Sequence, residues 1–149
     1  MPSKILLIDD NQDGRTIYGT ILRRAGHEVI DAADGEEGLR FAREHAPDLI
    51  LVELVLPRLD GWEVMRRLRA SPDTAGAEVI AVTAEWAHPL ALLHAGFRGF
   101  YYKLVRPDAF LETVEGCLAL RGTGRFLARR SDEGPPLRSP RPMEHAGTL

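Results

Sequence analysis

The stretch PDLILVELVLPRLDG, residues 47–61, joins a short apolar run to an acidic residue and a turn. The run Leu49–Val52 has the length and the composition of a buried strand. Glu53 ends this run, and a lone carboxylate in an apolar layer costs several kcal/mol. We therefore expect Glu53 to belong to a charged pocket rather than to the apolar core.

An earlier part of the chain has the same construction. The strand-like run that begins at Lys4 and ends at Ile8 is followed directly by Asp9 and Asp10. Both runs are nearly continuous in apolar residues, as is typical of strands covered by helices on both faces. Two acids at the end of a second buried strand point to the same kind of pocket.

The whole chain alternates short apolar strands with amphipathic helical patterns. Each strand is bounded by turn residues, and apolar residues recur at helical spacing between the strands. The predicted strands are 4–9, 28–32, 48–53, 78–83 and 99–103. The predicted helices are 13–25, 35–45, 60–70, 86–95 and 107–120. This order predicts an α/β fold, a parallel doubly wound sheet with helices on both faces.

Length and composition indicate one globular domain. The chain has 149 residues, 44% of them hydrophobic and 28% charged, which is enough for a single core. A single cysteine, Cys117, excludes an intramolecular disulfide and a cysteine zinc site, so we expect a small apolar core residue there. No apolar stretch approaches the roughly 20 residues that span a bilayer, and the start lacks a signal-peptide pattern. We expect a cytoplasmic location and no membrane partner.

The composition changes after Arg121. Residues 1–121 hold 14 Lys/Arg and 19 Asp/Glu, whereas residues 122–149 hold five Arg and three acids. The tail also has four Gly and four Pro in its 28 residues, which predicts disorder, although Phe126 and Leu127 could extend a last helical turn. It is too short and too weakly basic to indicate a nucleic-acid arm.

Several motifs at consistent spacing resemble the receiver domain of bacterial two-component response regulators. The resemblance covers about residues 3–121, and residues 122–149 lie outside it. Each motif alone is a weak signal, but together and in order they are specific. They are the pair Asp9-Asp10, Ala33–Leu39, Pro57, Asp60-Gly61, Thr83, and Lys103 seven residues after Gly96.

The resemblance implies a fold and the place of a site. The expected sheet is flavodoxin-like with strand order 2-1-3-4-5. In such a sheet the site lies at the carboxyl ends of the strands, where the order reverses between the first and third strands. Asp9, Asp10 and Glu53 would meet there.

The resemblance also implies phosphoryl chemistry. In that family an aspartate at the position of Glu53 accepts a phosphoryl group from a histidine kinase, and Mg²⁺ and a lysine neutralise the charge. The implied metal contacts are Asp10, Glu53, the Val55 backbone carbonyl, and Asp9 through water. The implied pairing and switch residues are Lys103, which holds the acceptor and then the phosphoryl group, Thr83, which donates to that group, and Phe100, which changes rotamer.

Two departures from the family pattern alter these expectations. The extra methylene of Glu53 moves its carboxylate by roughly 1.5 Å, and in-line transfer is sensitive to displacements of about 1 Å. Leu104 follows Lys103 where the family usually has a proline after a cis bond, and a cis bond before leucine would cost about 2.5–4 kcal/mol. We expect a trans bond before Leu104. We also expect a pseudo-receiver that binds Mg²⁺ weakly or not at all, in which Glu53 partly imitates the activated state.

Each candidate residue could also have a purely structural role. Asp9 and Asp10 could act only as helix caps, a role that Asn11 or Asp13 could share. The five histidines lack metal-ligand spacing. Thr83 could be a plain strand residue, and Lys103 could be a solvated strand end. Phe100 could be a core aromatic, and Trp86 could lie in the core or at the pocket mouth.

The function that these residues favour is phosphorelay signalling by a stand-alone receiver that is not an enzyme. The expected partners are a histidine kinase or a downstream effector, with a homodimer through the fourth helix, fifth strand and fifth helix as a further option, and no direct nucleic-acid contact. One alternative is a receiver that is phosphorylated on Glu53. Another is a small Mg²⁺-dependent phosphatase or phosphotransferase, although no histidine lies near Asp9-Asp10 for acid–base work. A flavodoxin-like nucleotide binder is disfavoured because residues 9–13 would repel phosphate.

Overall fold

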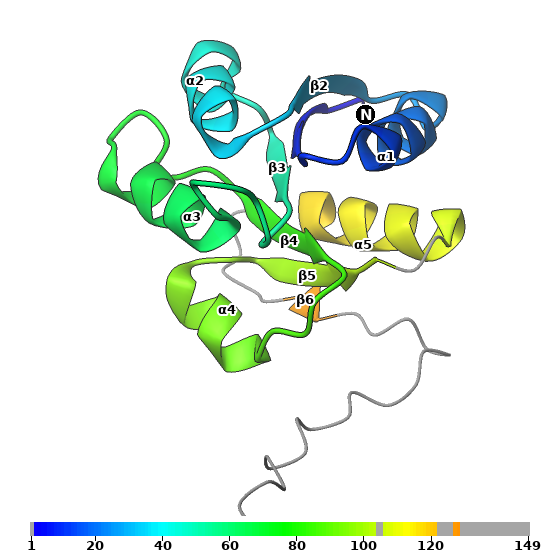
Figure 1. The fold of residues 1–149 in the computed structure, drawn as a ribbon. Helices are drawn as coiled ribbons and strands as arrows, with labels where there is room; N and C mark the ends of the chain where they lie inside the picture. The colour runs from blue at the N-terminus through cyan, green and yellow to red at the C-terminus, as the bar shows by residue number, and fades with distance from the viewer. Residues whose placement is uncertain (1, 104–105, 122–126, 129–149) are drawn as a thin grey trace, which may run out of the picture.

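The structure is a computed structural model that describes residues 2–103, 106–121 and 127–128. A parallel sheet in the order β2-β1-β3-β4-β5-β6 runs through it (Figure 1). The strands are β1 (Lys4–Ile8), β2 (Glu28–Ala32), β3 (Leu49–Val52), β4 (Val79–Thr83), β5 (Gly99–Tyr102) and β6 (Leu127–Ala128). The helices are α1 (Gln12–Arg24), α2 (Gly35–His45), α3 (Gly61–Ala70), α4 (Pro89–Ala95) and α5 (Pro107–Ala119). The predicted α/β class and the order of the first five strands are confirmed.

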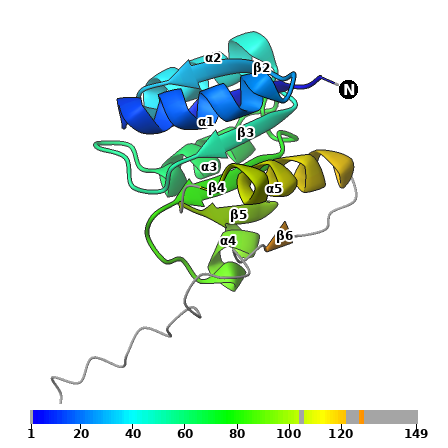
Figure 2. The same ribbon diagram turned by 90° about the vertical axis from the view of Figure 1, so that its right-hand side faces the viewer.

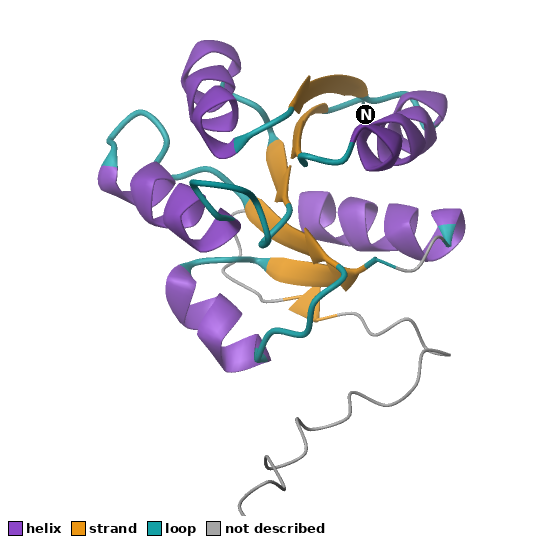
Figure 3. Cartoon of the chain, in the orientation of Figure 1, coloured by secondary structure: helices purple, strands orange, loops and turns teal. Residues whose placement is uncertain are grey.

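Helices cover both faces of the sheet, as the apolar strands predict. Alternate residues of each strand point to opposite faces, so each strand contributes to two cores. One core joins the sheet to α1 and α5, and the other joins it to α2, α3 and α4 (Figures 2 and 3). In β1, for example, Ile5 and Leu7 enter the first core, whereas Leu6 and Ile8 enter the second. The buried Cys117 of α5 lies in the first core, as predicted, and burial raises the pKa of its thiol to about 12.

Helix α4 begins three residues later than the sequence predicted. The predicted helix started at Trp86, but the observed helix starts at Pro89 after His88. The His88 Nδ1 atom accepts a hydrogen bond from the Leu90 backbone N–H at 3.1 Å, and proline at the first helical position already has the helical φ angle. The cap therefore leaves Trp86 in the loop between β4 and α4.

The described part of the C-terminal region differs from the prediction at two residues, Leu127 and Ala128, which form a strand in the tail predicted to be disordered. Leu127 does not extend α5; it pairs with Gly99 in the short strand β6. Phe126 and nearly all of the predicted disordered tail, residues 122–126 and 129–149, lie outside the described residues. In the part of the chain that is described, no helix has the length and the apolar character needed to cross a membrane.

Gly61 is the point where the chain turns from the β3 end into α3. Its N–H donates to the Leu54 carbonyl at 2.9 Å, which brings the start of the helix against the loop. A Cβ atom built on Gly61 would meet the Glu53 carbonyl oxygen and would lie 2.7 Å from the Leu54 Cα. Both obstacles are backbone atoms, so they cannot move aside without displacing the segment that carries Glu53.

We predict that Gly61→Ala lowers the free energy of unfolding by about 3 kcal/mol, because the added methyl group must push two backbone segments apart. The matched control is Gly76→Ala in an exposed loop, where an added Cβ meets nothing within 4 Å. This control should change stability by no more than about 0.5 kcal/mol. Urea unfolding followed by circular dichroism measures both values, and equal stability of the two variants would contradict the packing argument.

Candidate functional site

Strand register brings the predicted acids to one edge of the sheet. Ile8 of β1 and Val52 of β3 are paired, so Asp9 and Glu53 are the next residues on neighbouring strands. The Glu53 backbone N–H donates to the Ile8 carbonyl at 2.9 Å and continues the ladder by one residue. Two carboxylates therefore lie at the carboxyl end of adjacent strands, where the strand order reverses.

Strands β4 and β5 bring a hydroxyl and a cation to the same edge. Thr83 ends β4, and Lys103 follows β5 directly. The Lys103 backbone N–H donates to the Thr83 carbonyl at 2.8 Å, which fixes the two residues relative to each other. The four elements that carry these residues are consecutive neighbours in the sheet.

Both oxygens of the Glu53 carboxylate are engaged. Oε1 accepts hydrogen bonds from the Thr83 hydroxyl at 2.9 Å and from the Val55 backbone N–H at 3.0 Å. Oε2 lies 2.8 Å from the Lys103 ammonium nitrogen. Because Glu53 is only 6% exposed, these contacts replace the water that its charge would otherwise require.

Lys103 joins the two buried carboxylates. Its ammonium nitrogen lies 2.6 Å from Asp9 Oδ2 as well as 2.8 Å from Glu53 Oε2. Burial on its own would lower the pKa of Lys103, but the hydrogen bonds and negative charges of Asp9 and Glu53 outweigh it and raise that pKa. Lys103 is therefore a charged bridge and not a solvated strand end.

Thr83 also connects Glu53 to the loop that leads into α4. Its hydroxyl oxygen accepts a hydrogen bond from the Glu85 backbone N–H at 3.1 Å while it donates to Glu53. Thr83 is buried, so its hydroxyl is satisfied entirely within the protein. A plain strand residue would not need these two contacts.

The structure separates the two predicted aspartates. Asp9 is 2% exposed and its Oδ1 accepts from the Asn11 N–H at 3.0 Å, whereas Asp10 is exposed. The cap of α1 is Asn11, whose side chain accepts from the Gly14 N–H. The interpretation of the aspartates as helix caps alone is therefore wrong for Asp9, which pairs with Lys103.

Sequence reasoning missed two residues of α1 that support Asp9. The Arg15 Nη1 atom donates to the Asp9 carbonyl at 2.7 Å. A Cβ on Gly14 would lie 2.8 Å from Asp9 Oδ2, so glycine leaves room for the carboxylate. A glycine in the first turn of a helix is an unfavourable choice for the helix itself, and this is the signal that could have indicated a close approach.

The remaining predicted residues lie around this site. Phe100 is buried in the core on the α4 side of the sheet, which agrees with a core aromatic and leaves its switch role untested. Trp86 is 37% exposed and stacks edge-on with His88, so it is not a core residue. Leu104, and with it the predicted trans bond, lies outside the described residues.

The predicted Mg²⁺ contacts involve carboxylates at this edge of the sheet. Among the described residues, no three His, Cys, Asp or Glu side chains are grouped so that they could hold a metal ion. Asp9 and Glu53 both contact Lys103, and Asp10 is exposed. The Mg²⁺ contacts therefore stay a prediction.

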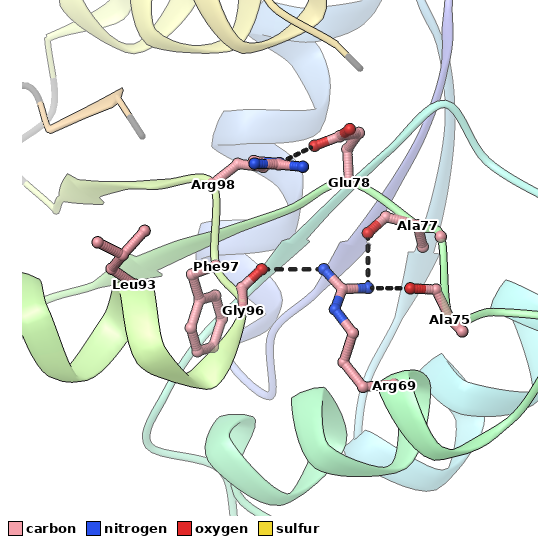
Figure 4. A pocket seen from close by; sticks show the side chains of 9 residues that line it. Arg69, Ala75, Ala77, Glu78, Leu93, Gly96, Phe97 and Arg98 are labelled. Carbon is pink, nitrogen blue, oxygen red and sulfur yellow. Dashed lines mark hydrogen bonds and ion pairs between the residues drawn. The ribbon is translucent and has the colours of Figure 1, made fainter. Parts of the chain in front are cut away.

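A pocket of about 230 Å³ lies at the opposite end of the sheet, beside the starts of β4 and β5 (Figure 4). There the Arg69 guanidinium donates to three backbone carbonyls, of Ala75 at 3.1 Å, Ala77 at 2.8 Å and Gly96 at 2.9 Å. Burial lowers the pKa of Arg69, and Arg98 pairs with Glu78 at 2.7 Å. The charged groups of Arg69, Arg98 and Glu78 thus bind other parts of the protein, which indicates a structural role for this pocket.

The site geometry predicts that Lys103→Met destabilises the protein strongly. Two buried carboxylates would lose their shared cation, and breaking a buried ion pair from one side costs about 3 kcal/mol or more. Since the folded pKa of Lys103 is raised, its contribution is complete below the unfolded lysine pKa of about 10.4 and is lost as the pH rises through the folded value.

Urea unfolding of the wild type and the variant at pH 7 and at alkaline pH measures this contribution. The matched control is Lys4→Met, which removes the ammonium that donates to the His45 carbonyl at 3.4 Å and should cost less than about 1 kcal/mol. An equal cost for the two substitutions at pH 7, or a Lys103→Met cost that grows above a pH of about 10.4, would contradict the bridge.

Comparisons with known proteins agree with this fold. Residues 5–115 match the family described as "Response regulator receiver domain". The chain is 31% identical over 120 residues to the polar-differentiation response regulator DivK of Brucella anthropi, covering 79% of this chain and 98% of that protein. It is 29% identical over 124 residues to protein PilH of Pseudomonas aeruginosa, covering 78% and 98%.

A solved structure shows the same architecture. The chemotaxis response regulator CheY4 of Vibrio cholerae superposes with a TM-score of 0.72 at 27% identity and covers 78% of this chain and 99% of its own. The family match spans most of the described sheet and includes each residue of the site. This chain belongs to the response regulator receiver domain family.

Proposed function

We propose that this chain is a stand-alone receiver in phosphorelay signalling that acts through protein–protein contact without phosphorylation of its acceptor position. The observation that carries the proposal is that the side-chain carboxylate of Glu53 makes the contacts expected of a phosphoryl group. It already holds the Thr83 hydroxyl and the Lys103 ammonium. These are the two groups that the family resemblance assigns to an added phosphoryl group.

The position of the Glu53 carboxylate supports this proposal on steric grounds. A phosphoryl group added to Glu53 would have to displace Thr83 from Oε1 or Lys103 from Oε2. Displacing Lys103 would also disturb its contact with Asp9. In-line transfer is sensitive to displacements of about 1 Å, so a carboxylate held in this way is a poor acceptor.

Charge limits how far Glu53 imitates a phosphorylated aspartate. A glutamate carries one negative charge, compared with about 1.5 to 2 on a phosphate at neutral pH. Glu53 therefore orders Lys103 and Thr83 as a phosphorylated aspartate would, but more weakly. We therefore propose a partial imitation of the activated state, in which Mg²⁺ binds weakly or not at all.

The output would pass through the loop that follows β4. Glu53 orders Thr83, and Thr83 holds the Glu85 N–H, so the carboxylate fixes the start of this loop. Beyond it, Trp86, Leu90 and Leu93 are 37%, 58% and 42% exposed. We propose that these three apolar side chains contact a kinase or an effector protein.

We predict that the wild type remains unmodified after incubation with acetyl phosphate and Mg²⁺, because Glu53 already occupies the contacts of the phosphoryl group. The Glu53→Asp variant should gain about 80 Da, the mass of one phosphoryl group, in a form that hydroxylamine removes. Intact-protein mass spectrometry measures both.

The control is Glu53→Gln, which keeps the length of the side chain but lacks the carboxylate, and it should also remain unmodified. Addition of a hydroxylamine-labile phosphoryl group to the wild type but not to Glu53→Gln would show that Glu53 is a working acceptor, and the proposal would be wrong.

A further inference from the structure

The sheet continues for one strand beyond the predicted five. β6 pairs in parallel with the outer edge of β5, with Leu127 opposite Gly99 and Ala128 opposite Phe100. In both views β6 lies beside β5 on the side away from β4 (Figures 1 and 2). Without β6, β5 would be the edge strand of the described sheet.

An uncovered β5 edge would be prone to pairing with another chain. The sequence of β5 is Gly-Phe-Tyr-Tyr, which contains neither a charged residue nor a proline. Exposed apolar edge strands offer free N–H and C=O groups to any extended segment, and proteins cover or charge such edges. This edge lies between α4 and α5, the face through which the family resemblance implies a homodimer.

We propose that β6 is an intrachain cap, in which Leu127–Ala128 occupies the β5 edge and prevents a second copy of this chain from pairing there. β5, α5 and β6 form a strand–helix–strand unit in the same direction as the rest of the sheet. Residue 127 comes eight residues after the end of α5, so the cap is tethered to its site and has a high effective concentration.

Charge complementarity favours the same occupant. Residues 122–149 carry five Arg and three acids, whereas residues 1–121 carry 14 basic and 19 acidic residues. The segment is therefore net positive and the domain that it follows is net negative, so long-range attraction favours the approach of Leu127 and Ala128 to this domain. A paired stretch of two residues gives little stability, so a competing strand can displace it.

The β6 cap does not depend on Glu53, because β6 contacts β5 and α5 and lies outside the carboxylate site. Neither outcome of the phosphorylation experiment on Glu53 would therefore count for or against the β6 cap. The homodimer through α4, β5 and α5 would then form only when β6 leaves the edge.

The test uses two full-length variants, Leu127→Pro and Ala128→Pro. Consecutive N–H groups of a strand point to opposite sides, so one of the two prolines removes a donor to β5. Hydrogen–deuterium exchange of residues 99–102 should be at least about fivefold faster in that variant, while β1 and β3 keep their protection and show that the domain is folded. Sedimentation velocity should show a larger dimer fraction in the same variant.

The matched control is Leu137→Pro, the same substitution at a position outside β6, which should leave both readings unchanged. Unchanged exchange of β5 in both β6 variants would overturn the cap. If β5 exchanges faster in a variant that remains as monomeric as the wild type, β6 does not prevent self-association.

Discussion

The Lys103 ammonium between two buried carboxylates is the interaction on which the site depends. Its contacts at 2.6 Å to Asp9 and 2.8 Å to Glu53 connect the ends of β1, β3 and β5. Each carboxylate would be costly to bury alone, and each is tolerated because the cation lies between them. Thr83 and the Val55 N–H complete the coordination of Glu53 and bring in β4 and the loop after β3. The carboxyl edge of the sheet is thus held together by one network.

The network gives physical meaning to a glutamate at the position where the family resemblance implies an aspartate. A longer side chain does not leave the acceptor position empty; it reaches the hydroxyl and the ammonium that surround it. The Thr83 hydroxyl in turn accepts a hydrogen bond from the Glu85 N–H, so one carboxylate orders the beginning of the β4–α4 loop. Under the proposed function, the chain would replace a reversible covalent signal by a permanent and weaker one. Regulation would then depend on which proteins are present to bind, and on access to their surface.

The α/β class followed from the periodicity of the sequence, whereas the strand order and most of the site were implied by the resemblance to the receiver family. The structure brings Asp9, Glu53, Thr83 and Lys103 together at one edge, whereas the sequence indicated this placement only through that resemblance. It could not predict which aspartate would be buried, since Asp9 and Asp10 differ only in the direction in which they leave β1. The support from Gly14 and Arg15, the late start of α4 and strand β6 depend on tertiary contacts and capping that periodicity does not encode.

The central claim is that Glu53 holds Thr83 and the β4–α4 loop as a phosphorylated acceptor would. Nuclear magnetic resonance of the Glu85 backbone amide tests it most directly, because that N–H donates to the Thr83 hydroxyl at 3.1 Å. The amide shift of the wild type should be compared with those of Glu53→Asp before and after labelling with acetyl phosphate. The account predicts that the wild type lies closer to the labelled variant. A wild-type shift that coincides with the unlabelled variant would contradict the account.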